Sequence, residues 1–498
     1  MKITFKNKSI LELESDIILI FLDESLELSD IINQINESTN KSISLIIEQK
    51  DFKGKVNETF LISTSNPNFK RLLLIGIGRK KDANLETLRN SAAAAIKKIK
   101  KLEKKSCTLL IEEDIIDNNT YENVVAAITE GAILGNYKYI KLKTEELDKY
   151  YFIEELIYPK IPQSVQKAIK DINIVCNATI FVRDLVNEPA NIATPTRMAN
   201  AAEEIAKELN LTSKIYDEEE LEKMGFGSFL SVARGSNEPC KFITIEYIPE
   251  KKSLKTIAFV GKSITMDTGG ISLKPSNGMW EMKQDMHGGA TVIGIIKAAA
   301  ELKLPFHIIT LTPATENMPG GPKPNKPGDV IKSYSGKTIE ILNTDAEGRL
   351  ILADALAYAS KYKPDIVIDF ATLTGACRVA LGSFASGIFS DDDELVDQLI
   401  KAGEETHERL WRLPLWKEYG DVMKSDIADV RNLNPTRIGG ASSAAAFLKF
   451  FTTKDYKWAH IDIAPTDHAE NDKGYISKGA TGVGVRLGIQ FLRNFIKK

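Results

Sequence analysis

Apolar residues in the first 160 positions form short runs that alternate with longer helical patterns. An apolar run of about four to eight residues between polar ones is typical of a buried strand, whereas apolar spacings of three and four are typical of a helix. Leu85–Leu102 has the helical spacing, and a further helix is expected from about Val165 to Val186. The predicted strands are Ile17–Leu22, Ser44–Ile47, Arg71–Ile77 and Thr108–Ile111.

The rest of the chain repeats strand and helix patterns in turn. Such alternation predicts a mostly parallel central sheet flanked by helices. The predicted strands are Phe242–Tyr247, Thr256–Val260, His307–Leu311, Thr338–Leu342 and Ile366–Phe370. The predicted helices are Ala290–Leu302, Leu350–Ser360, Ser442–Phe451 and Gly482–Lys497.

Together these patterns predict an α/β protein of two domains, a smaller N-terminal α/β domain and a larger C-terminal one. A chain of 498 residues is long enough to bury more than one core. The sequence Ile-Pro-Gln-Ser at Ile161 is expected to end the first domain. The expected boundaries are residues 1–160, a linking helix over 161–190, and the larger domain over 191–498.

Candidate chemistry first appears in Asn-Thr-Asp-Ala-Glu-Gly-Arg-Leu at residues 343–350. Asp345, Glu347 and Arg349 occupy alternate positions, and alternate side chains of an extended backbone point the same way. Two carboxylates on one face repel each other unless a cation lies between them. A metal site and an ordinary surface turn both stay open on this octapeptide alone.

A second polar segment follows the predicted strand Thr256–Val260. It supplies Lys262, Asp267, Lys274 and Asp285. In an open α/β sheet, ligands bind at the carboxyl ends of the strands, so these groups are placed where a site is expected. The two segments together contribute four acids and two lysines, which favours the metal site.

At these two segments the chain resembles the leucyl aminopeptidase family of dinuclear metallopeptidases, peptidase family M17. The resemblance runs from about Phe181 to the C-terminus, and the first 160 or so residues match only loosely. Further matching segments are Arg183–Asn191, Glu316–Pro319, Pro327–Val330, Ala371–Ala376 and Trp458–Ala464.

The resemblance implies a metal centre of two divalent ions. Asp267 and Glu347 would bridge both ions, Lys262 and Asp285 would complete the tighter site, and Asp345 would complete the more exchangeable one. Ligands that are mostly oxygens, without Cys or His, suit Mn²⁺, Zn²⁺ or Mg²⁺, so the identity of the metal stays open. Lys262 binds a metal only as a neutral amine, and two adjacent cations lower its pKa.

The resemblance also implies a metal-dependent aminopeptidase that attacks the peptide bond with a metal-bridging hydroxide. Lys274 would donate to the developing oxyanion, and Arg349 would hold a bicarbonate ion that accepts the proton of the water. The expected substrates are short peptides, and the expected assembly is a homohexamer. The implied pocket for the first substrate residue is mostly apolar, which favours Leu or another apolar residue. Its implied members are Met282, Asn343, Thr372, Gly375 and Ala480.

Some positions depart from the usual pattern of the family. Ser263 stands where Gly is usual, Met266 stands where Phe is usual, and His287-Gly288-Gly289 stands where Gly-Gly-Ala or a similar small run is usual. His287 lies two residues beyond Asp285, so a contact with a metal ligand is one interpretation. Local packing at a helix start is the favoured one, because the ligand set is already complete.

Composition and charge bear on the expected partners, redox state and location of the protein. The net charge is −3, which argues against a dominant role in binding nucleic acid or anionic membranes. The four cysteines have no CxxC spacing and are expected to be reduced thiols. The apolar run Ile17–Leu22 is too short for a signal peptide or a membrane span, so a cytoplasmic location is expected.

Two lesser features have alternative interpretations. A lysine-rich stretch over residues 97–105 is read as a solvated helix face, because aromatic residues do not interleave it; DNA binding, which occurs in the resembling family, stays open as a second role. His460 and Asp462 are read as parts of a buried strand rather than as a catalytic pair, because no nucleophile motif accompanies them.

Overall fold

The computed structural model describes residues 1–436 and 438–496. The chain divides into two compact units. The first comprises Met1–Asn177 and Glu470–Lys478, and the second comprises Ala178–Ala469 and the residues from Gly479 onward. Among the described residues, no helix is both long and apolar enough to cross a membrane.

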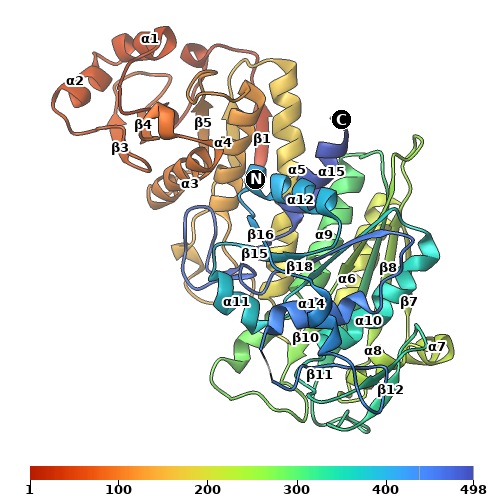
Figure 1. Cartoon of the computed structure of the whole chain (residues 1–498). Helices are drawn as coiled ribbons and strands as arrows, with labels where there is room; N and C mark the ends of the chain where they lie inside the picture. The colour runs from red at the N-terminus through yellow and green to blue at the C-terminus, as the bar shows by residue number, and fades with distance from the viewer. Residues whose placement is uncertain (437, 497–498) are drawn as a thin grey trace. The chain divides into compact units, whose positions relative to one another are not determined.

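The first unit is built on a six-stranded sheet (Figure 1). All neighbouring strands are parallel except β3, which is antiparallel to β4. In sheet order the strands are β1 (Lys2–Phe5), β6 (Glu155–Tyr158), β5 (Ser106–Leu110), β2 (Ile18–Leu22), β4 (Arg71–Gly76) and β3 (Thr59–Ser63). The helices are α1 (Asp30–Ser38), α2 (Ser42–Glu48), α3 (Leu85–Lys101) and α4 (Tyr121–Asn136), together with the part of α5 (Gln163–Asn187) that precedes Ala178.

One predicted strand of this unit is wrong. Ser44–Ile47 lies in helix α2. Ile43 is fully buried in the core of the sheet, and Ile46 and Ile47 pack against the same core. These spacings of three and four place the three side chains on one helical face, and in so short a run they cannot be told from a strand.

The second unit contains a nine-stranded sheet whose middle strands are parallel. Ala258 and Val260 of β9 face a core shared with helix α10, whereas the alternate residues Ile257 and Phe259 are buried on the other side. In sheet order the strands are β16 (Leu410–Arg412), β15 (Ser386–Phe389), β18 (Lys457–Asp462), β14 (Ile366–Ala371), β9 (Thr256–Gly261), β11 (His307–Asn317), β8 (Lys241–Tyr247) and β7 (Thr212–Tyr216), with β10 (Ser263–Asp267) paired to β11.

Helices cover both faces of this sheet (Figure 1). The main ones are α6 (Pro195–Leu209), α8 (Gly227–Ala233), α9 (His287–Glu301), α10 (Gly348–Ala359), α12 (Asp393–Thr406), α14 (Gly440–Lys449) and α15 (Val485–Ile496). Shorter ones are α7 (Glu218–Met224), α11 (Gly375–Leu381) and α13 (Lys417–Asp421). The predicted α/β class, with two domains and a mostly parallel central sheet in the larger one, is confirmed.

One predicted strand differs in the structure, and one predicted helix end is not tested by it. The predicted strand Thr338–Leu342 ends at Glu340 and lies in a separate three-stranded sheet, as β13 between β12 (Val330–Lys332) and β17 (Val430–Arg431). The last predicted helix reached Lys497, which lies outside the described residues. Strand β13 leads into the turn that carries Asp345.

Candidate metal centre

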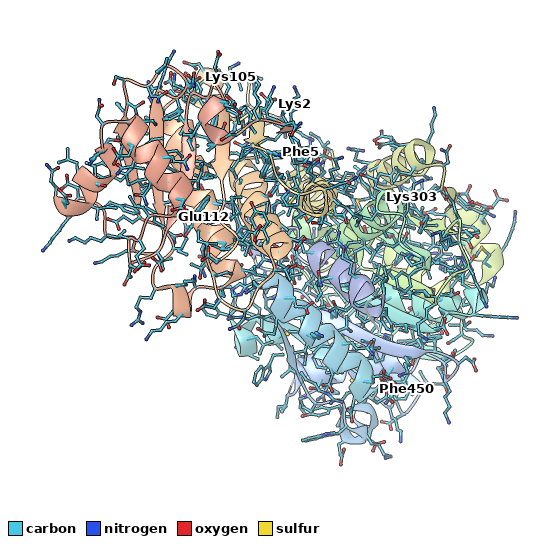
Figure 2. All side chains as sticks on the ribbon, turned by 90° about the horizontal axis from the view of Figure 1, so that it is seen from above. Lys2, Phe5, Lys105, Glu112, Lys303 and Phe450 are labelled. Carbon is cyan, nitrogen blue, oxygen red and sulfur yellow. The ribbon has the colours of Figure 1, made fainter. Side chains whose placement is uncertain are left out.

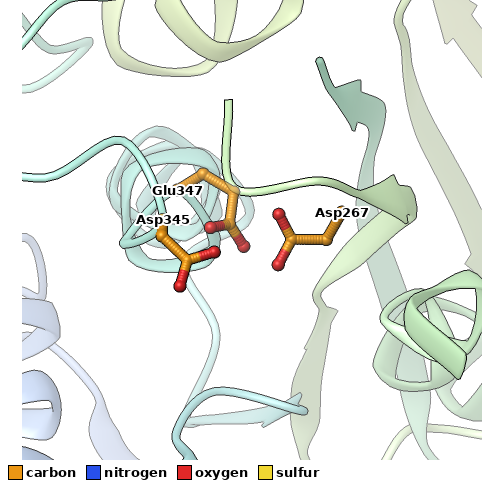
Figure 3. A group of neighbouring side chains, drawn as sticks. All are labelled: Asp267, Asp345 and Glu347. Carbon is orange, nitrogen blue, oxygen red and sulfur yellow. The ribbon is translucent and has the colours of Figure 1, made fainter. Parts of the chain in front are cut away.

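Three carboxylates converge beside the central sheet (Figure 3). Asp267 ends β10, Asp345 lies in the turn after β13, and Glu347 directly precedes helix α10. One oxygen from each lies within 4.8 Å of the others. Asp267 and Glu347 are almost fully buried, whereas about a third of the Asp345 side chain is exposed. Three anions this close require positive charge among them.

Two lysines place positive charge among these carboxylates. The Lys262 Nζ lies 2.7 Å from Asp285 Oδ2 and 3.0 Å from Glu347 Oε1. The Lys274 Nζ lies 2.8 Å from Asp267 Oδ2 and 2.5 Å from Asp345 Oδ1. Each ammonium group therefore bridges a pair of carboxylates.

Burial and mutual repulsion disfavour the ionised form of three of the acids, Asp267, Asp285 and Asp345. Burial, followed by the charges of Asp267 and Glu347, raises the pKa of Asp345 to about 6. Burial likewise raises the pKa of Asp267 and of Asp285. For Lys262, burial alone would lower the pKa, but the carboxylates of Asp285 and Glu347 raise it above its ordinary value. A donor set of several carboxylates and one amine fits hard or borderline divalent cations.

The turn that presents Asp345, Glu347 and Arg349 is not the extended backbone assumed from their alternate spacing. Glu347 has helical backbone angles, φ −75° and ψ −37°, and α10 begins at Gly348. The three side chains still line one cavity, because the turn reverses the chain before the helix starts. The prediction of an extended strand end was wrong. The turn before α10, and not an extended backbone, brings the three side chains together.

Arg349 is held inside the second unit rather than at its surface. Its Nη1 donates to the backbone oxygen of Asn432 at 2.7 Å, and burial lowers the pKa of its guanidinium to about 10. Its buried Nε has no hydrogen-bond partner among the described residues. Arg349 thus stays cationic at neutral pH and keeps an unused donor.

Asn317 supports the acids, although the sequence patterns assigned it no role. Its amide nitrogen donates to Asp267 Oδ1 at 2.8 Å and to the backbone oxygen of Thr344 at 3.0 Å, and it lies 3.3 Å from Glu347 Oε2. One side chain therefore orients carboxylates from two separate segments. The only signal for it in the sequence was the matching segment Glu316–Pro319.

A second supporting contact comes from the loop after β14. Thr372 accepts a hydrogen bond from Lys262 Nζ through its backbone oxygen at 2.9 Å, and its hydroxyl donates to Asp285 Oδ1 at 2.7 Å. Asp462 holds the next turn of this loop, accepting from the Thr374 hydroxyl at 2.7 Å. His460 Nδ1 lies 2.6 Å from Asp369 Oδ1, and both His460 and Asp462 are buried residues of strand β18, as expected.

Two of the departures from the family pattern have structural explanations. A Cβ on Gly289 would lie 2.7 Å from the Cβ of Ser263, so the larger residue at 263 requires the smaller one at 289. His287 is fully buried at the first position of α9, and burial lowers the pKa of its imidazole to about 3. A neutral, enclosed ring at a helix start agrees with local packing.

All seven predicted site residues line one cavity of about 260 Å³. They are Lys262, Asp267, Lys274, Asp285, Asp345, Glu347 and Arg349. Of the implied pocket for the first substrate residue, Met282, Thr372 and Gly375 line the same cavity, whereas Asn343 and Ala480 are not among its described lining residues. Arg378 and Asp467 also line it and were not anticipated.

Comparison with known proteins identifies the class to which this site belongs. A sequence profile described as the cytosol aminopeptidase family, catalytic domain, matches residues 180–489, and its N-terminal domain profile matches residues 17–146. The chain is a metal-dependent aminopeptidase, a hydrolase. It belongs to the cytosol aminopeptidase family, so the resemblance seen in the sequence is confirmed, and it extends to the N-terminal domain.

Individual relatives are similar to this chain over nearly its whole length. A probable cytosol aminopeptidase of Geobacter sp. (strain M21) is 45% identical over 90% of this chain and 91% of its own length. One of Roseiflexus castenholzii is 44% identical over 92% and 94%. Among solved structures, a mutant of tomato leucine aminopeptidase has a TM-score of 0.87 at 30% identity, covering 99% and 96%. The bottromycin maturation enzyme BotP in complex with Mn has a TM-score of 0.86 at 30% identity, covering 97% and 99%.

Proposed function

We propose that this aminopeptidase releases N-terminal residues, preferentially Leu or other apolar ones, from short peptides at a centre of two divalent metal ions. The observation that carries the proposal is the convergence of Asp267, Asp345 and Glu347 in one cavity, with one oxygen of each within 4.8 Å of the others. Carboxylates this close favour a bound cation, and divalent metal ions can activate water for hydrolysis.

The metal-holding residues would be Lys262, Asp267, Asp285, Asp345 and Glu347. When bound, two divalent ions supply a nucleophilic water and stabilise negative charge on the attacked carbonyl oxygen. Lys262 must lose its proton to serve as a ligand, because only the neutral amine has a lone pair. The manganese in the BotP structure supports Mn²⁺ as one candidate, beside Zn²⁺ and Mg²⁺.

Two cationic residues would act on the reacting groups. Lys274 would donate a hydrogen bond to the developing oxyanion, since it is charged and lies at the edge of the acid cluster. Arg349 cannot be a base, but its unpartnered Nε is a donor suited to an anion. We assign that place to bicarbonate, which would accept the proton of the attacking water.

The proposed preference for apolar residues rests on the neutral part of the cavity wall. Met282, Leu373 and Ala464 line it, and burial raises the pKa of Asp467 to about 8, so this acid is mostly uncharged at neutral pH. A pocket of this kind holds an aliphatic side chain better than a charged one.

We also propose a cytoplasmic homohexamer. The relatives are named cytosol aminopeptidases, which supports the location. The small residues of α14 pack inside their own chain, but the neighbouring Ile438 is 76% exposed and Phe384 is 71% exposed. Exposed large apolar side chains of this kind support a subunit interface, and light scattering on the purified protein measures the assembly.

One experiment tests the proposed chemistry directly. Metal-stripped protein is assayed on leucyl, aspartyl and lysyl amides after separate addition of Mn²⁺, Zn²⁺ and Mg²⁺. Activity restored by at least one metal, and greatest on leucyl amide, is expected. N-acetyl-leucyl amide serves as the matched control, because it lacks the free amino group that a metal would bind. Its cleavage at a comparable rate, or full activity of the stripped protein, contradicts the proposal.

A further inference from the structure

A second cavity, of about 750 Å³, lies entirely within the first unit. Its walls come from the end of α3, the end of α4, the segment 148–152 and the distant segment 472–477. The segment 472–477 is anchored there, since the Tyr475 hydroxyl donates to Glu86 of α3 at 3.1 Å. None of the residues that line this cavity lines the metal centre.

Lysines dominate the charge of this cavity. Five lysines line it against three acids, Glu103, Asp148 and Asp472. The lysines are Lys97, Lys100, Lys101, Lys138 and Lys149. Lys97 and Lys100 are half-buried rather than solvated, unlike the freely exposed helix face expected from the sequence.

Lys97 and Lys100 have no carboxylate partner within 4.0 Å among the described residues, and Lys138 reaches only Asp472, at 3.8 Å. The Lys100 Nζ donates to the backbone oxygen of Asn136 at 3.1 Å and lies 4.7 Å from the ring centre of Phe152. Burial, followed by the charge of Lys138, lowers the pKa of Lys100 to about 8. Burial also lowers the pKa of Lys97. The cavity therefore holds positive charge that its own acids do not balance.

The remaining wall is aromatic and has one unused polar group. Five rings line the cavity: Tyr137, Tyr150, Tyr151, Phe152 and Tyr475. Ser477 also lines it, is only 9% exposed, and its Oγ has no hydrogen-bond partner among the described residues. A buried hydroxyl without a partner is uncommon and suits a ligand that accepts a hydrogen bond.

We propose that this cavity binds a small organic anion that carries an aromatic ring. The lysine amines would neutralise the anionic group, the rings would stack on the ligand ring, and the Ser477 hydroxyl would donate to an oxygen. A concave site with half-buried lysines favours a small ligand over duplex DNA, which requires charge on an accessible surface. The proposal does not depend on the chemistry proposed for the metal centre.

Phenyl phosphate is the probe, because it joins a ring to a dianion. Titration calorimetry compares it with inorganic phosphate, which lacks the ring, and with phenol, which lacks the charge. Phenyl phosphate is expected to bind at least about tenfold more tightly than either, since each fragment makes only part of the contacts. Its affinity is expected to fall as the pH rises through about 8, where Lys100, facing Lys97, Lys138 and Asp472, loses its proton.

The variant Lys97→Gln/Lys100→Gln is expected to weaken phenyl phosphate binding by about tenfold or more, because charge-assisted contacts are lost. Lys105→Gln is the matched control. Lys105 belongs to the same lysine-rich stretch, lies at the surface of the first unit (Figure 2) and pairs with Glu154 at 2.8 Å, but does not line the cavity. Ser477→Ala is expected to weaken binding less. Thermal unfolding and hydrolysis of leucyl amide, both expected to be unchanged, show that the variants are folded.

Three results overturn the proposal. The first is wild-type protein that does not bind phenyl phosphate at millimolar concentration. The second is equal binding by the double variant and the wild type, or equal weakening by Lys105→Gln. The third is binding of duplex DNA that depends steeply on salt, displaces phenyl phosphate and is absent in the double variant. The lysines would then bind nucleic acid rather than a small anion. If the double variant unfolds, Lys100→Arg takes its place in the test. It keeps the positive charge, so it is expected to keep phenyl phosphate binding, and loss of binding in this folded variant would contradict the proposal.

Discussion

Replacing Gly348 by alanine should impair the metal centre without unfolding the protein. Gly348 is the first residue of α10. A Cβ at this position would lie 2.5 Å from Lys262 Cε, 2.6 Å from Nζ and 2.8 Å from Cδ, whereas ordinary contacts begin at 3.4 Å. Lys262 is only 3% exposed and is enclosed by Asp285 and Glu347, so its amine cannot move into solvent.

The size of the effect follows from that overlap. To restore an ordinary contact, the Lys262 amine must move by roughly 1 Å, and a displacement of about 1 Å can reduce catalysis about 100-fold. This corresponds to about 2.7 kcal/mol of lost transition-state stabilisation. Gly348 is the first residue of α10 rather than an interior one, so alanine gains only part of the roughly 1 kcal/mol by which it stabilises a helix interior relative to glycine. We therefore expect a modest loss of stability together with a large loss of activity.

The assay combines kcat/KM on leucyl amide, metal content by elemental analysis and thermal unfolding. Gly420→Ala is the matched control, because Gly420 lies in helix α13 and an added Cβ would make ordinary contacts with the Phe450 ring, at 3.7 Å from Cζ and 3.9 Å from Cε2. It should leave kcat/KM and metal content unchanged. If Gly348→Ala retained kcat/KM within about threefold of wild type with full metal content, the position of the Lys262 amine would not matter, and its assignment as a ligand would be wrong.

Other variants test the remaining roles. Asp267→Ala should abolish activity and empty both metal sites, whereas Asp345→Ala should empty mainly one; two metals still bound to Asp267→Ala would refute the bridging role. Lys274→Ala should lower kcat by about 100-fold or more with metal content intact, and Arg349→Ala should lower it less and remove any stimulation by added bicarbonate; unchanged kcat in both would refute these roles. Burial raises the pKa of Asp354 in α10 to about 7, so the folded state holds this proton more tightly and the free energy of unfolding should fall as the pH rises from about 4 to 7. Asp354→Asn should remove that dependence, which amounts to at most about 4 kcal/mol; equal slopes in chemical denaturation from pH 4 to 7 would contradict it.

Local patterns in the chain were sufficient for most of the elements. The buried runs that became β2, β4 and β9 are mainly apolar, because a strand covered on both faces needs mostly apolar residues. Helix α3 was equally clear from its spacing. Ser44–Ile47 failed because four residues do not separate the periods of a helix and a strand.

The site likewise separates what local motifs predict from what only the folded chain shows. Its four acids, two lysines and Arg349 were chosen from two motifs of the chain, and the structure brings all seven residues to one cavity. Motifs do not reveal contacts across sequence distance: Asn317 donates to Asp267, which lies 50 residues away, and Asp462 holds Thr374, which lies 88 residues away. Nor does a lysine-rich stretch show which of its amines are half-buried. Chemical type is a property of each residue, whereas proximity and burial arise only when distant segments pack together.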